Sequence, residues 1–206
     1  MKLSSLALCA LLALAALGQP AAFARSHDPS ASNQYGGPVY SGVPDLVTVG
    51  AFISAGGGPR TFSARTALNN VIGVQLVDPE IQTLQQQYGA AAVSSWLQTF
   101  DFVMRDAAVQ TSAAGVTLPL ASPTHTGKAL FTALLQDGTD SGSTFWTGTM
   151  LDKLVSHPIH VQMMRNVDAT FGANADGGYH RITNQFMYDV AVQLGLGDDV
   201  KLSSYH

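Results

Sequence analysis

Between residues 62 and 194, apolar side chains recur every three or four positions, the spacing that gathers them on one face of an α-helix. This pattern predicts four clear helices, at about 91–114, 128–136, 145–155 and 179–194. It predicts shorter helices after Ser63 and from Asp78-Pro79-Glu80, each ending at a glycine, and a further one up to Phe171. We therefore expect an all-α, single-domain bundle of about six or seven helices.

Two segments, around Pro158 and at residues 45–54, depart from this regular spacing. Pro158 cannot donate a backbone hydrogen bond and disfavours helical geometry at His157, so the helix should kink or restart there. Residues 45–54 are apolar and β-branched but too short for periodicity to distinguish a strand from a helix. The apolar faces of the predicted helices contain the residues that we expect in the core: Trp96, Phe100, Met104, Leu134, Met150, Leu154, Phe186 and Val190.

The N-terminus has the pattern of a secretory signal peptide. Lys2 precedes an uncharged apolar run from Leu6 to Leu17, Pro20 interrupts it, and Ala22-Phe23-Ala24 matches an A-x-A cleavage site. The run is shorter than the roughly 20 residues that span a bilayer, which argues against a transmembrane anchor. We expect residues 1–24 to be removed and the protein to reach the periplasm or the medium. A flexible leader at 25–61 and a helical domain at 62–206 would remain.

Composition excludes several functional classes. Ten Lys and Arg against fourteen Asp and Glu, for a net charge of −4, cannot supply the basic face that a nucleic acid requires. The single cysteine, Cys9, lies inside the predicted signal peptide. The mature chain would therefore contain no disulfide, thiolate metal site, iron–sulfur cluster or C-x-x-C-H haem attachment.

The best chemical candidate is a cluster of histidine and methionine residues. In a helix, His157, His160 and Met164 would lie near one another, and His180 could join them from the last helix. Imidazole and thioether ligands suit copper, which makes these four residues candidate metal ligands. Non-covalent haem is a second cofactor hypothesis, with axial ligation by His160 paired with His180 or Met187. The alternative for all of them is core packing or helix capping.

No complete catalytic motif is present, so a non-enzymatic role is favoured. G-x-S-x-G and H-E-x-x-H patterns are both absent. His180 and Asn184 could line a ligand pocket at a helix N-terminus, although simple capping explains them as well. Two functions remain open. One is an exported protein that binds a metal or haem, and the other is a cofactor-free protein that acts through contacts with an envelope protein or through an apolar pocket for a small ligand.

Overall fold

The helical periodicity of the chain is realised as eight α-helices in the described residues of a computed structural model, which covers residues 37, 39–120, 126–197 and 201–202. In chain order they are α1 (Leu46–Ala55), α2 (Ala64–Ile72), α3 (Val74–Tyr88), α4 (Ala90–Ala113), α5 (Gly127–Gly138), α6 (Thr147–Val155), α7 (His157–Phe171) and α8 (Ala175–Gln193). Two short strands, β1 (Thr144–Phe145) and β2 (Lys201–Leu202), pair in parallel. The predicted signal peptide lies outside the described residues.

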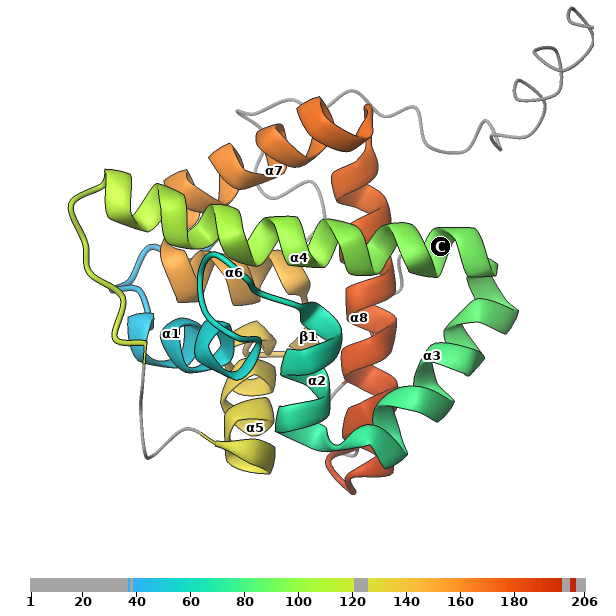
Figure 1. Ribbon diagram of the computed structural model, residues 1–206. Coiled ribbons are helices and arrows are strands. Elements are labelled where there is room, and N and C mark those ends of the chain that lie inside the picture. Colours follow the sequence, from blue (N-terminus) through green and yellow to red (C-terminus); the bar gives the residue numbers. More distant parts are fainter. Residues whose placement is uncertain (1–36, 38, 121–125, 198–200, 203–206) are drawn as a thin grey trace, which may run out of the picture.

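The helices pack into one hydrophobic core, which confirms the all-α class and the single bundle. Helix α4 packs against α3, α7 and α8, while α5 packs against α6. Figure 1 shows α4 running across the molecule with α8 crossing it. All eight predicted core residues are buried, from Trp96 and Phe100 on α4 to Phe186 and Val190 on α8. Among the described helices, none is both long and apolar enough to cross a membrane.

Helix α1 extends the packed domain further towards the N-terminus than the sequence pattern indicated. The side chain of Asp45 accepts hydrogen bonds from the backbone N–H groups of Val47 and Thr48 and so caps the helix. Phe52 and Ile53 are then buried in the core. The ambiguous segment 45–54 is therefore helical, and the boundary that we expected at residue 62 is too late. Burial outweighs the β-branched composition of this segment.

Helix α3 begins before the start signal that the sequence contains. It starts at Val74 and carries Pro79 inside, so Asp78 is not its N-cap. The Asp78 carboxylate instead pairs with the Arg65 guanidinium of α2. Gly73 makes the earlier start possible because its φ of 93° turns the chain directly from α2 into α3.

The break at Pro158 is confirmed, and it positions the candidate site. Helix α6 ends at Val155, Ser156 alone forms the link, and α7 starts at His157 with Pro158 in its first turn. Proline is tolerated there because the first N–H groups of a helix have no partner within the helix. The one-residue link brings the last turn of α6 close to the first turn of α7.

Candidate metal centre

Asp152 is the centre of a polar cluster between α6 and α7. Its side chain has no exposure to solvent and lies in a helix whose other residues are mostly apolar or small. An ionised carboxylate in such a place is costly unless it receives hydrogen bonds or binds a cation. The hydrogen-bond donors to Asp152 come from the start of α7.

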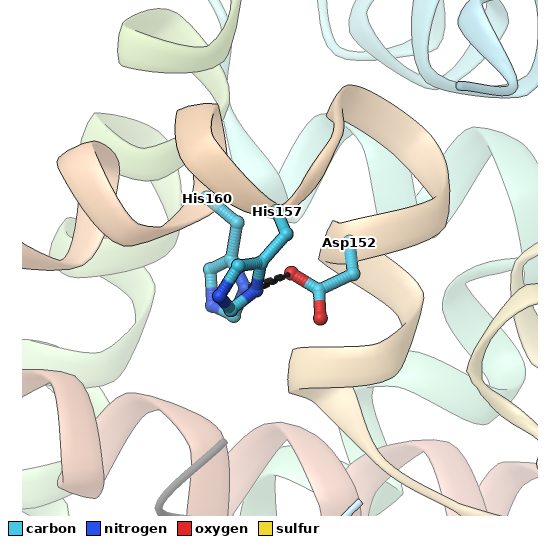
Figure 2. A network of polar contacts seen from close by, with 3 residues as sticks. All are labelled: Asp152, His157 and His160. Atoms are coloured by element: carbon cyan, nitrogen blue, oxygen red, sulfur yellow. Dashed lines mark hydrogen bonds and ion pairs between the residues drawn. The ribbon is translucent and has the colours of Figure 1, made fainter. Parts of the chain in front are cut away.

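Two histidines meet the same oxygen of Asp152. The Nδ1 atom of His160 lies 2.7 Å from Asp152 Oδ1, and the Nδ1 atom of His157 lies 2.9 Å from it. Figure 2 shows both rings on one side of the carboxylate. The carboxylate accepts, so each neutral imidazole carries its proton on Nδ1 in this arrangement. The three residues hold the end of α6 to the beginning of α7.

The two rings converge on the carboxylate. Their centroids are 6.4 Å apart, whereas both Nδ1 atoms lie within hydrogen-bond distance of one oxygen. The Nδ1 atoms are therefore closer together than the ring centres. One donor atom from each of the three residues lies within 4.8 Å of the other two, which is compatible with a single metal ion. The nitrogen that points into this space is Nδ1 on each ring.

The cluster is buried on one side and reaches solvent on the other. Side-chain exposure is 0% for Asp152, 6% for His160 and 32% for His157. Two of its polar atoms, Asp152 Oδ2 and His160 Nε2, are buried and make no hydrogen bond within the described part of the chain. Native proteins rarely leave buried polar atoms without a partner, and a bound water or ion commonly serves as that partner.

His180 lies next to this cluster but is held separately. Its ring centroid is 5.6 Å from that of His160, so the fold brings together the three histidines that the sequence singled out. Its Nδ1 atom lies 2.8 Å from the backbone oxygen of Asp176, one turn earlier on α8. His180 does not belong to the described group of residues whose donor atoms all lie within 4.8 Å of one another.

Asn184 has a structural role in the same region. Its Oδ1 atom accepts hydrogen bonds from the backbone N–H of Thr147 at 2.8 Å and from the Thr147 hydroxyl at 2.6 Å. Thr147 is the first residue of α6, so Asn184 caps that helix from α8. Asn184 is buried and caps α6 rather than its own helix, so it differs from the solvated cap that the sequence allowed. It also fixes the helix that carries Asp152.

The two candidate methionine ligands lie in the hydrophobic core. Met164 and Met187 are 2% and 5% exposed, and both pack among the apolar residues that join the helices. The two histidines proposed as axial haem ligands, His160 and His180, have ring centroids 5.6 Å apart. The described His and Asp donor atoms that lie close enough together to share an ion belong to Asp152, His157 and His160.

Asp152 is the residue that sequence reasoning missed. A signal was present, because it is the acidic residue within the apolar run from Trp146 to Val155. Periodicity assigns it no partner, since His157 and His160 lie beyond a helix break. Only the angle between α6 and α7, set by Ser156, brings the carboxylate to the imidazoles.

Comparison of the chain with models of protein families, with curated proteins and with solved structures finds no match in any of the three.

Proposed function

We propose that this chain is an exported metal-binding protein that holds a divalent first-row transition-metal ion with Asp152, His157 and His160. The observation that carries the proposal is the convergence of two imidazole Nδ1 atoms on one buried carboxylate oxygen. Two imidazoles and one carboxylate are a donor set used for zinc, copper and iron. The proposed export is supported by the signal-peptide pattern of residues 1–24.

The competing explanation is that the cluster only fastens α6 to α7. Hydrogen bonds to an ionised group contribute about 1.5–3 kcal/mol each, so a purely structural cluster would be well justified. The two explanations differ in what a substitution changes. A metal ligand controls ion affinity, whereas a fastening group controls only the stability of the metal-free protein.

Calorimetric titration with Zn²⁺ and Cu²⁺ tests the proposal. The protein is purified without a polyhistidine tag, stripped with a chelator, and its mass is measured to show whether residues 1–24 are removed. We expect one ion per chain, tighter binding of Cu²⁺ than of Zn²⁺, and weaker binding as the pH falls below neutrality because protons compete for the nitrogens. His160→Gln and Asp152→Asn should each weaken binding at least tenfold.

Two matched variants control for general damage. Asp106→Asn changes another partly buried carboxylate that accepts two side-chain hydrogen bonds, from Gln110 and Asn166. Gln162→Ala changes an exposed residue on α7, two positions after His160. Both should bind metal as the unaltered protein does. If His160→Gln and Asp152→Asn retain full affinity and lose only stability in chelator, the cluster is a fastening device and the proposal is wrong.

A further inference from the structure

We infer that the metal centre keeps one coordination position on its His157 side for a small monoanionic ligand from solution, an inference that rests on the proposed function. The first argument is the number of ligands. Within the described chain, only Asp152, His157 and His160 form a group of potential ligands with donor atoms close enough to share an ion. Four-coordinate zinc sites with three protein ligands leave the fourth position for water or substrate.

The neighbouring histidine, His180, lies outside the group of proposed ligands. The ring centroids of His180 and His160 are 5.6 Å apart, but His180 is hydrogen-bonded through its Nδ1 atom to the Asp176 carbonyl on α8. It lies on the buried side, at 1% exposure, whereas the third ligand His157 is the one that solvent reaches. The remaining position is therefore expected next to His157.

Charge indicates what the position binds. A divalent ion with one carboxylate and two neutral imidazoles keeps one positive charge, and the Asp152 and His160 side of the site is buried. A net charge in such surroundings is costly unless it is neutralised. A monoanion such as a carboxylate or azide neutralises it, while neutral water does not. The site thus favours a small anion over a neutral ligand.

Cobalt provides the test, because Co²⁺ substitutes for Zn²⁺ and its visible bands report on its ligands. The Co²⁺-loaded full chain is titrated with azide, and the expected result is a saturable change in the visible spectrum together with a new azide-to-cobalt charge-transfer band. His180→Gln, loaded in the same way, should respond with the same apparent azide affinity. Free Co²⁺ in the same buffer gives the background.

Each other outcome has a definite meaning. If azide changes the spectrum of the His180→Gln variant but not that of the unaltered protein, His180 fills the position. If azide changes neither spectrum, no position is open. Either result overturns the inference. Absence of Co²⁺ binding in the unaltered protein would instead refute the proposed function itself. If His180→Gln does not fold, X-ray absorption on the zinc-loaded protein still counts the imidazole ligands of the metal. Two imidazole ligands support the inference, and three overturn it.

Discussion

At the scale of single residues, Ser156 stands out by its backbone conformation. Three one-residue links join consecutive helices, with φ and ψ of 93° and 149° at Gly73, 90° and 147° at Gly89, and 93° and 150° at Ser156. Glycine adopts this region freely, whereas other residues incur a cost on the order of 1–3 kcal/mol. The one strained link of the three therefore lies between Asp152 and the two histidines. Such strain is often stored next to functional groups.

Ser156→Gly should stabilise the protein. Relief of the strained backbone is partly offset by the greater freedom of glycine in the unfolded chain, so we expect a net gain of about 1 kcal/mol in the free energy of unfolding. Urea denaturation in the presence of a chelator measures it. The matched control is Gly89→Ser, which places a side chain at the same backbone angles where a Cβ would meet nothing within 4 Å.

The control should lose about 1 kcal/mol, because the added conformational strain is partly offset by the smaller freedom of serine in the unfolded chain. The two substitutions thus measure the same quantity with opposite signs. A stability loss in Ser156→Gly would show that the serine side chain makes a contact worth more than the strain.

At the scale of elements, side chains of one helix cap the beginnings of others. Asp101 of α4 accepts a hydrogen bond from the N–H of Ala64 at the start of α2, and Asp168 of α7 accepts one from the N–H of Asp176 at the start of α8. Asn184 does the same for α6. These groups satisfy helix N–H donors that have no partner within their own helix. Several of the few acidic residues are therefore used to orient helices relative to one another.

A pair of carboxyl groups joins α3 to α8 in a different way. Glu80 is 2% exposed and faces Asp189, and Gln193 donates to Glu80 Oε2 at 2.9 Å. Burial, followed by the charge and the hydrogen bond of Asp189, raises the pKa of Glu80 from 4.5 to about 7. The folded protein therefore retains a proton that the unfolded chain releases at lower pH.

This pair should make stability depend on pH. Because the folded-state pKa of Glu80 is raised, its contribution is fully present below pH 4.5 and is lost as the pH rises through about 7. Glu80→Gln mimics the protonated group, so it should match the unaltered protein near pH 4 and exceed it at pH 8.5 by on the order of 1–3 kcal/mol. Urea denaturation at the two pH values measures the difference.

Asp189→Asn is the informative control for this pair. It removes one of the two charges, so the pKa of Glu80 should fall towards its ordinary value while burial still holds it up. The loss of stability at high pH should shrink without disappearing. Equal pH profiles for Glu80→Gln and the unaltered protein would contradict the raised pKa of Glu80.

At the scale of the whole molecule, periodicity predicted most of the fold. The long stripes around Trp96 and Phe186 marked α4 and α8 well, because burial of one helical face leaves a regular spacing in the sequence. The start of α3 was placed wrongly because local capping signals compete with tertiary partners, here Arg65 for Asp78. The site was predicted only in part: His157 and His160 were named, but Asp152 required the angle between two helices.

One aromatic cluster connects α1, α4 and α8. Phe100 lies at its centre, with ring centroids 5.8 Å from Phe52, 5.9 Å from Trp96 and 5.6 Å from Tyr179. Phe100 itself is 5% exposed. Removing a ring at this position leaves a cavity between three helices, which neighbours on three rigid elements cannot easily fill.

Phe100→Ala should therefore lower the free energy of unfolding by roughly 3–5 kcal/mol, the cost of emptying a well-packed aromatic site. The matched control is Phe102→Ala on the same helix, because Phe102 is only partly buried and packs edge-on against Phe171, which is 37% exposed. Solvent can occupy that space, so the control should lose about 1–2 kcal/mol. Urea denaturation followed by tryptophan fluorescence measures both. Equal losses would mean that α4 is held evenly along its length, and that the aromatic cluster is not the centre of the core.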